Sequence, residues 1–348
     1  MREAVMDPAS KRPRFPWPAL VLFFLSPVVG ELLSSASPPV EFFSVFGLTV
    51  MSVLYGSGAL LVREACVRWG TGWPGRLLLG AAYGIVEEGL MVKSFFDPNW
   101  PDLGVLGSYG RMYGVNWVWS LELTIYHCLF SICIPIVLTE LAFPKWRDRP
   151  WLKTPGLLVF GVLLAADVAY GAGWLAPYRP PLAPYLGAVI AVAGLVAAAR
   201  LVRQPAGPVS IAPARTTEAP RVPGPRELPF FLFAATCTAL FFALNWVLPS
   251  GRLVPPVVTM SLVAALAIGF LAGLRELVRA FSWTAANQWA LASGALAFFI
   301  AFSQLVELDS NRPDDPRGMR IVGFVAAALL LAGFLSMRRE GANRPASG

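Results

Sequence analysis

Long runs of apolar residues, separated by short polar segments, dominate this sequence. A helix that crosses a bilayer needs about 20 mostly apolar residues, at about 1.5 Å of rise per residue. Ten stretches meet this requirement, and we expect each of them to be a membrane-spanning helix: residues 16–36, 42–66, 74–96, 115–142, 155–176, 183–202, 229–248, 254–275, 283–306 and 319–337. The pattern therefore predicts an all-α fold, a polytopic transmembrane helix bundle.

The composition favours a membrane protein over a soluble one. Of the 348 residues, 56% are hydrophobic and 14% are charged, whereas a soluble domain has about 25% charged residues. The net charge of +7 comes from short basic clusters between the apolar runs, a pattern typical of membrane-protein loops. We therefore expect the lipid bilayer as a partner and no nucleic acid. The four cysteines lie in or beside apolar segments, which favours buried, unpaired thiols.

The basic residues alternate between the two sides of the predicted bundle. With the N-terminus placed in the cytoplasm, 21 of the 28 Lys and Arg residues fall on the cytoplasmic side and seven fall on the other side. Cytoplasmic loops of membrane proteins carry such an excess of Lys and Arg. The count predicts a multi-pass integral protein of the cell membrane, with both termini in the cytoplasm.

One polar segment is much longer than the other connections. Residues 204–228 are rich in Pro and Ala and hold too few large apolar residues to bury a core. We interpret this segment as a cytoplasmic linker. It divides the chain into a six-helix membrane domain, residues 1–203, and a four-helix membrane domain with a short cytoplasmic tail, residues 229–348.

Three consecutive predicted helices carry ionisable side chains near the middle of their length. These side chains are Glu87 and Glu88 in the third helix, His127 in the fourth and Asp167 in the fifth. A charge at the bilayer centre costs about 2.5–3.5 kcal/mol on insertion scales, so such residues face the bundle interior or a wet cavity. We therefore expect all four side chains to point inward.

Small and hydroxyl side chains share the faces of these helices. Gly80 and Gly84 lie on the face of the two glutamates, and Ser131 lies on the face of His127, at the spacing of three or four residues that aligns side chains along a helix. Small residues let neighbouring membrane helices approach closely. We expect the three faces to meet and to form one polar cluster.

Such a cluster can do chemistry. A carboxylate can take a proton from water while an imidazole stabilises the charge that develops, and adjacent carboxylates raise each other's affinity for protons. The candidate catalytic residues are therefore Glu87, Glu88, His127 and Asp167. A proton relay would use the same groups, and a cluster that only holds the helices together is the alternative without chemistry.

No cofactor is required by this sequence. A catalytic zinc site usually has three protein ligands and is rich in histidine, whereas this chain has one histidine. Zinc bound by His127 with nearby carboxylates is possible, but the ligand set is poor.

Two adjacent glutamates in one membrane helix, with a histidine about 40 residues later in the next, resemble the CPBP family of CAAX-processing and bacteriocin-processing intramembrane proteases. The motifs of that family are EExxxR, FxxxH and a later HxxxN-type motif. Glu87 and Glu88 match the double acid, and His127 matches the histidine of the second motif. The resemblance implies a glutamate-activated water that cleaves a peptide bond within the membrane, in a membrane-embedded peptide or a lipidated substrate.

The match to these motifs is partial. Lys93 stands one position after the basic residue of the first motif, Leu123 replaces the aromatic residue of the second, and Asp167 lies near the place of the missing second histidine. Two other classes of function therefore stay open. The chain could be a transporter or proton-coupled permease with acids at mid-depth, or a non-catalytic membrane scaffold.

Overall fold

The computed structural model describes residues 17–202, 226–251, 254–310 and 312–342. Nearly all of the predicted linker 204–228 lies outside the described residues. The α-helices are α1 (Trp17–Pro27), α2 (Pro39–Phe42), α3 (Val45–Met51), α4 (Ser57–Trp69), α5 (Gly72–Ile85), α6 (Trp117–Tyr126), α7 (Ile134–Ala142), α8 (Thr154–Tyr170), α9 (Leu182–Leu201), α10 (Leu228–Phe242), α11 (Pro256–Phe281), α12 (Ala285–Val306) and α13 (Met319–Ala342).

Shorter helical segments continue or connect these helices. The π-helical segments are η1 (Val28–Leu32), η2 (Ser52–Gly56), η3 (Val86–Met91), η5 (His127–Cys133), η7 (Gly171–Leu175) and η8 (Ala243–Val247). The 3₁₀ segments are η4 (Pro101–Gly107), η6 (Pro144–Trp146) and η9 (Pro249–Gly251). Two short strands, β1 (Arg111–Met112) and β2 (Val115–Asn116), pair in antiparallel fashion.

Eight helical stretches of the described chain are long and apolar enough to cross a membrane. They are Val45–Trp69, Trp117–Ala142, Thr154–Leu175, Leu182–Leu201, Leu228–Gly251, Pro256–Phe281, Ala285–Val306 and Met319–Arg339. Two further helical stretches coincide with predicted spans. The first, Trp17–Leu32, is shorter, and the second, α5 with η3, carries three charged residues. The all-α polytopic bundle is confirmed, while the number of ten crossings stays a prediction.

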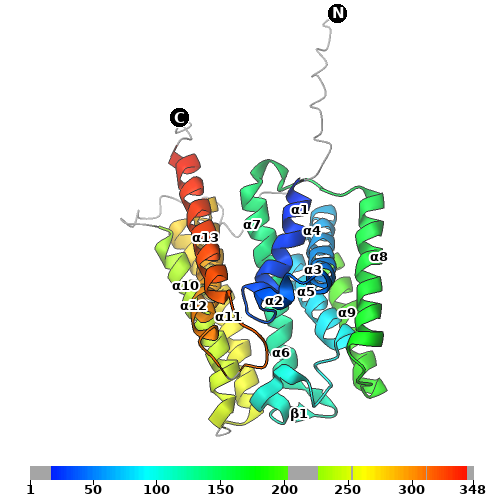
Figure 1. The fold of residues 1–348 in the computed structure, drawn as a ribbon. Coiled ribbons are helices and arrows are strands. Elements are labelled where there is room, and N and C mark those ends of the chain that lie inside the picture. Colours follow the sequence, from blue (N-terminus) through cyan, green and yellow to red (C-terminus); the bar gives the residue numbers. More distant parts are fainter. Residues whose placement is uncertain (1–16, 203–225, 252–253, 311, 343–348) are drawn as a thin grey trace, which may run out of the picture.

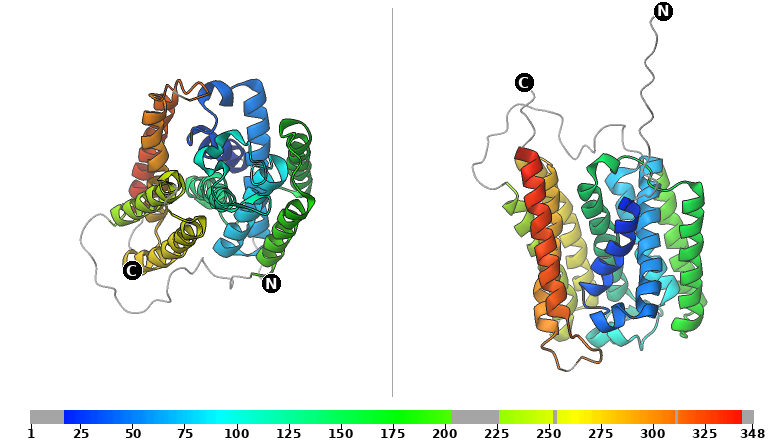
Figure 2. Two further views of the ribbon diagram at one scale, coloured as in Figure 1. Left: turned by 90° about the horizontal axis from the view of Figure 1, so that it is seen from below. Right: turned by 45° about the horizontal axis from the view of Figure 1, so that its top comes forward.

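The helices form two neighbouring groups that share an apolar core. Helices α10–α13 stand beside the group formed by α1 and α3–α9 (Figures 1 and 2). Tyr126, Phe130 and Val137 from the α6–η5–α7 stretch pack with Phe242 and Phe299 of the second group. The rings of Phe130 and Phe299 meet edge to face, 4.9 Å apart. The groups thus contact each other directly, and their division into separate domains stays a prediction.

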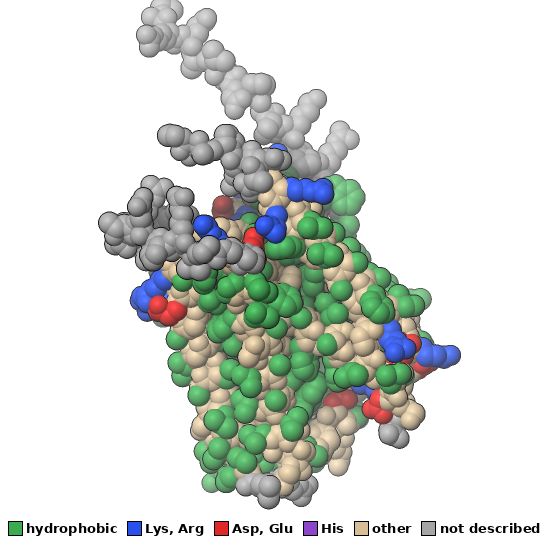
Figure 3. Space-filling model, turned by 90° about the vertical axis from the view of Figure 1, so that its left-hand side faces the viewer, with side chains coloured by type: hydrophobic (Ala, Val, Ile, Leu, Met, Phe, Trp, Pro, Cys, Tyr) green, Lys and Arg blue, Asp and Glu red, His purple; other side chains and the backbone are tan. Residues whose placement is uncertain are grey.

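The two ends of the bundle differ in their chain connections. The start of α1, the end of α13 and the connection from α7 to α8 lie at one end, which we call the inner end, and the β1–β2 hairpin lies at the other, outer end (Figure 1). Hydrophobic side chains cover the face in Figure 3 between charged side chains near the two ends. This belt implies a lipid bilayer around an integral membrane protein. Assignment of the inner end to the cytoplasm stays a prediction.

The connection between η3 and α6 is a folded cap over the outer end. Phe95, Phe96, Leu103 and Leu106 form an apolar cluster with residues around the start of α6. The Tyr109 hydroxyl reaches the second group of helices, where it donates to the Val254 carbonyl at 2.8 Å and lies 2.8 Å from the Thr259 hydroxyl. This segment is therefore packed against the bundle rather than extended into solvent.

Lys93, at the start of this cap, is buried. Its ammonium group donates to the carbonyls of Ala172, at 2.7 Å, and Ala176, near the end of η7. Carbonyls at a helix C-terminus lack intrahelical partners and favour a nearby cation.

The four cysteines are free thiols. Cys66, Cys128 and Cys133 are buried, and Cys237 is half-buried. They contribute to the apolar interior, as their positions in apolar runs predicted.

Candidate functional site

The π-helical segments of four neighbouring stretches bring the polar side chains of the site together. Glu31 lies in η1, Tyr55 in η2, Glu87 and Glu88 in η3, and His127 in η5. A π-helical turn inserts an extra residue into a helix, and such turns occur frequently at functional sites. Each of the four stretches thus departs from regular α-helical geometry at its site residue.

His127 lies between the two glutamates. Its Nδ1 is 3.1 Å from Glu87 Oε2, and its Nε2 is 3.0 Å from Glu88 Oε1. The Ser131 hydroxyl lies 3.0 Å from the same Nδ1. The His127 and Glu87 side chains are 3% and 5% exposed, whereas that of Glu88 is 12% exposed. Glu88 is therefore the more accessible of the two carboxylates.

Close packing of α5 against η5 makes these contacts possible. A Cβ atom at Gly80 would lie 3.0 Å from Cys128 Sγ, and one at Gly84 would lie 3.1 Å from the Cβ of His127. Larger residues at either position would push the two helices apart. The predicted small-residue face thus meets the histidine face, as expected from their spacing.

Tyr55 extends the site toward the first helix. Its hydroxyl forms hydrogen bonds with the carboxyl groups of both Glu31 and Glu87. The Ser37 hydroxyl donates to the other oxygen of Glu31 at 2.8 Å. Neither Glu31 nor Tyr55 is among the four catalytic candidates named from the sequence. A lone Glu in the first apolar run was the visible signal, but nothing in the local sequence connects Glu31 to Tyr55, 24 residues later.

Hydroxyl groups support the rest of the site. Ser94 donates to Glu88 Oε2, and the Trp119 indole nitrogen donates to Ser94 Oγ at 3.0 Å. On the other side, Ser26 donates to the carbonyls of Ser131, at 2.6 Å, and Tyr55, at 3.1 Å. These bonds tie the π-helical segments together and fix the orientation of the catalytic candidates.

The site lies toward the outer ends of the short helices. Glu31 is the second-last residue of η1, and Glu87 and Glu88 fall in the six-residue segment η3 that ends its helix. The first and third predicted spans thus end close to their carboxylates. This places the cluster nearer to the cap than the mid-depth position expected from the sequence.

Asp167 does not belong to this hydrogen-bonded network. It is buried on α8, and its Oδ2 has no hydrogen-bond partner among the described residues. Its connection to the site is indirect, through electrostatic interaction with Tyr83, which also interacts with Glu87. The structure therefore unites three of the four predicted residues, Glu87, Glu88 and His127, and places the fourth to one side.

The same three residues could hold a metal ion. One ligand atom from each of Glu87, Glu88 and His127 lies within 4.8 Å of the others. The two ring nitrogens of His127 face different carboxylates, so a single ion could use only one of them. The set offers one imidazole and two carboxylates, which matches the poor zinc ligand set predicted from the sequence.

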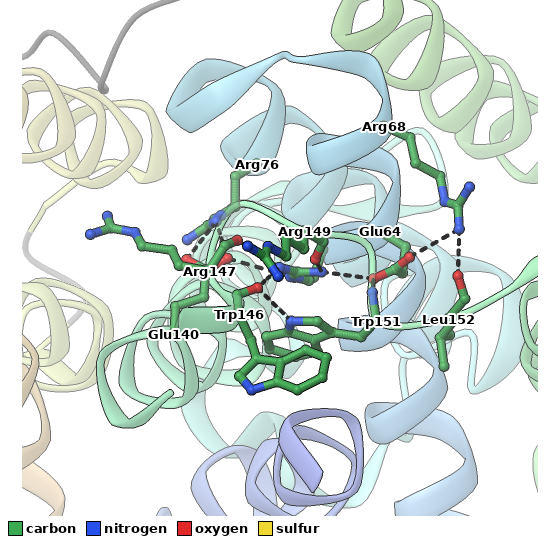
Figure 4. A network of polar contacts seen from close by, with 10 residues as sticks. Glu64, Arg68, Arg76, Glu140, Trp146, Arg147, Arg149, Trp151 and Leu152 are labelled. Carbon is green, nitrogen blue, oxygen red and sulfur yellow. Dashed lines mark hydrogen bonds and ion pairs between the residues drawn. The ribbon is translucent and has the colours of Figure 1, made fainter. Parts of the chain in front are cut away.

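A second buried polar network lies at the inner end (Figure 4). Arg63 is fully buried, donates to Glu64 at 2.7 Å and donates to the carbonyls of Trp146, Arg147 and Arg149. Its guanidinium lies 3.7 Å from the centroid of the Trp151 ring. This network holds the connection between α7 and α8 against the bundle.

Arg76 and Glu140 complete the inner network. An Arg76 nitrogen lies 3.0 Å from both Glu140 oxygens, and Glu140 is also 3.5 Å from Arg63 Nε. Most donors and acceptors here pair with one another, while Arg63 Nε, Arg76 Nε and one Glu64 oxygen have no hydrogen-bond partner among the described residues. We interpret the inner network as structural.

A large apolar cleft lies elsewhere, between α10, α12 and α13. Its volume is about 680 Å³, and it is lined mainly by Ala, Leu, Ile and Phe side chains. None of the residues of the site lines it. Its position on spans of the second group suits lipid chains rather than water chemistry.

Comparison with known proteins places the chain in a family without assigning an activity. A model of a family described as an uncharacterized membrane protein family matches residues 20–344. A protein of Archaeoglobus fulgidus, described as an uncharacterized protein, is 28% identical over 156 residues, which cover 42% of this chain and 47% of the relative. The match thus spans about half the length of that relative. No solved structure matches the chain.

Proposed function

The chain belongs to an uncharacterized membrane protein family, and we propose that it is an intramembrane peptidase that uses a glutamate–histidine pair to activate water. The observation that carries the proposal is the contact of His127 with Glu87 on one ring nitrogen and Glu88 on the other. The resemblance to the double acid and histidine of the CPBP proteases supports the same chemistry.

Glu88 is the better placed of the two carboxylates to act as the general base. It is the more exposed of the two. One of its oxygens accepts a hydrogen bond from Ser94 and the other faces His127, and lone pairs remain on these oxygens for a water molecule. The water oxygen bonds to the scissile carbonyl carbon while Glu88 takes one water proton. The C–N bond then breaks, and that proton passes to the leaving amine.

His127 contributes charge and orientation. Held between two carboxylates and shielded from solvent, the imidazole is oriented toward Glu88 without needing to reorganise. A cationic imidazole beside the reacting carbonyl stabilises the oxyanion, and such preorganised charge is worth most where water is excluded. A membrane-embedded or lipidated peptide is the substrate class that would reach a site within the helix bundle.

The test is a comparison of protein termini in membranes that carry the wild type, Glu88→Gln or His127→Ala. We expect cleaved termini in the wild-type membranes that are absent from both variants. Glu122→Gln is the matched control, because Glu122 is a buried glutamate on α6 that accepts from Trp246 and takes no part in the site. Identical termini in all four samples would rule out a peptidase.

A second candidate function is proton-coupled transport. The observation that favours it is the continuous chain of contacts from Glu31 through Tyr55, Glu87 and His127 to Glu88, which has the parts of a proton relay. Under this hypothesis a pH gradient across proteoliposomes drives uptake in the wild type and not in Glu87→Gln. A scaffold would instead lose stability or partner binding in the same variants, with no change in termini or uptake.

A further inference from the structure

The hydrogen bonds of Tyr55 limit the protonation states of its neighbours. A tyrosine hydroxyl has one hydrogen to donate, and an ionised carboxylate can only accept. The Tyr55 hydroxyl contacts both Glu31 and Glu87. If both carboxyl groups were ionised, two acceptors would compete for one hydrogen. A proton on one of the two groups, donated to the phenol oxygen, removes this competition.

The surroundings of the two carboxyl groups decide which one carries that proton. The second oxygen of Glu87 lies 3.1 Å from the His127 ring, a potential cation that favours a carboxylate. The second oxygen of Glu31 accepts only from the neutral hydroxyl of Ser37. The titratable groups that face Glu31 from the neighbouring segments are Tyr55, Tyr83, Glu87, Glu88, Tyr126 and His127.

We propose that Glu31 is a neutral carboxylic acid in the resting protein, and that Glu31 and Tyr55 together keep Glu87 ionised beside His127. Glu31 donates to the Tyr55 oxygen, and Tyr55 donates to the Glu87 carboxylate. His127 donates from both ring nitrogens, to Glu87 and to Glu88. With this arrangement each contact of the chain has one hydrogen, and every donor has an acceptor.

The role of the Glu31–Tyr55 pair rests on the proposed function. A neutral Glu31 leaves the Tyr55 hydrogen to Glu87, so that Glu87 stays a carboxylate that holds His127 cationic and oriented toward Glu88. During cleavage the water proton passes through Glu88 to the leaving amine, and no proton leaves Glu31, Tyr55 or His127. Glu31 and Tyr55 are positioning residues that do not touch the substrate.

Infrared spectroscopy of the purified protein in lipid nanodiscs tests the protonation of Glu31 without any substrate. A protonated carboxyl group has a carbonyl stretch that is separate from carboxylate bands and shifts in deuterated water. We expect Glu31→Gln to remove one such band, Tyr55→Phe to shift it, and Glu87→Gln to remove carboxylate intensity instead. Glu122→Gln is the control for loss of a buried carboxyl group outside the network.

Three results would overturn the proposal. They are an acid band unchanged in Glu31→Gln, an acid band that disappears in Glu87→Gln instead, and one equivalent of a divalent metal that is lost in Glu88→Gln. A metal would show that a cation rather than a proton balances the carboxylates. Should Glu31→Gln fail to fold, an acid band that shifts in Tyr55→Phe and persists in Glu87→Gln decides the question.

The same variants separate this proposal from the peptidase. If cleaved termini are present in the wild type, we expect Tyr55→Phe to slow their formation by about tenfold or more, while Glu88→Gln removes them. If the wild type cleaves nothing, the peptidase fails, and the infrared result on Glu31 stands or falls on its own.

Discussion

The inner network and the outer site both bury charged side chains, but they differ in charge balance. Positive and negative groups are paired in the inner network, whereas acids are in excess in the outer site. In the inner network, Arg63 and Arg76 contact Glu64 and Glu140, and backbone carbonyls accept further hydrogen bonds from Arg63. In the outer site, two glutamates flank a single histidine and Glu31 joins them through Tyr55, and among the described residues no Lys or Arg pairs with these acids. Paired charges hold the chain in place, whereas unbalanced acids must hold protons or a ligand.

Helix geometry separates the two networks in the same way. The inner residues lie in regular α-helices: Arg63 and Glu64 in α4, Arg76 in α5 and Glu140 in α7. The ionisable residues of the outer site lie in π-helical segments. The comparison indicates that regular helices suffice to bury ion pairs, and that the outer site required local changes of helical phase.

Removal of the central inner arginine gives the largest expected loss of stability. Arg63→Ala removes one donor from Glu64 and from each of three carbonyls, and it removes the stacking on Trp151. Breaking a buried ion pair in this way costs about 3–5 kcal/mol of unfolding free energy. Thermal unfolding in detergent measures it. Arg68→Ala is the control, since Arg68 is one-third exposed, and we expect it to cost under about 1 kcal/mol.

Glu122, a buried acid outside both networks, gives an expected loss of stability of intermediate size. The Trp246 indole nitrogen donates to Glu122 at 2.8 Å, and the other oxygen of Glu122 has no hydrogen-bond partner in the described chain. Trp246→Phe leaves this carboxyl group without its donor and should cost about 1–3 kcal/mol. Trp117→Phe, at an exposed indole, is the matched control. Equal effects of both variants would contradict a role for the buried hydrogen bond.

The outer site should respond in function more than in stability. Glu88→Gln keeps the shape of the side chain and removes one charge from an excess of acids. We therefore expect its unfolding free energy to stay within about 1 kcal/mol of the wild type, with cleavage lost. The same unfolding measurement checks this. A loss as large as that of Arg63→Ala would identify the outer site as structural and would remove the contrast between the two networks.

A half-buried ion pair at the outer end gives the smallest expected effect. Arg312 donates to Asp314 and to the Ser35 carbonyl at 2.9 Å, and this guanidinium lowers the pKa of Asp314. Because the folded pKa lies below the ordinary Asp value of about 3.9, the pair stabilises the protein above that value. The contribution is lost as the pH falls through the lowered pKa. Asp314→Asn should cost under about 1 kcal/mol and remove this part of the acid dependence.

Local sequence was sufficient for the class of fold and for the centre of the site. Each apolar run carries its own signal, because a helix in a membrane satisfies its backbone internally and needs only length and hydrophobicity. Glu87, Glu88 and His127 could be paired because they interrupt consecutive helices at similar depth, with Gly80 and Gly84 marking the contact face. The structure confirms that these three residues meet.

The remaining members of the site depended on contacts that local sequence does not encode. Asp167 lies near the middle of its predicted helix, as His127 does, yet α8 places it beside the network. Glu31 joins the site through Tyr55, from another helix. A π-helical turn changes the direction in which the following side chains point, and its position follows from packing between helices. The sequence by itself therefore determined a membrane helix bundle with a Glu–Glu–His centre. Only the tertiary structure decided which further carboxyl group shares its protons, because that choice depends on how helices distant in sequence pack against one another.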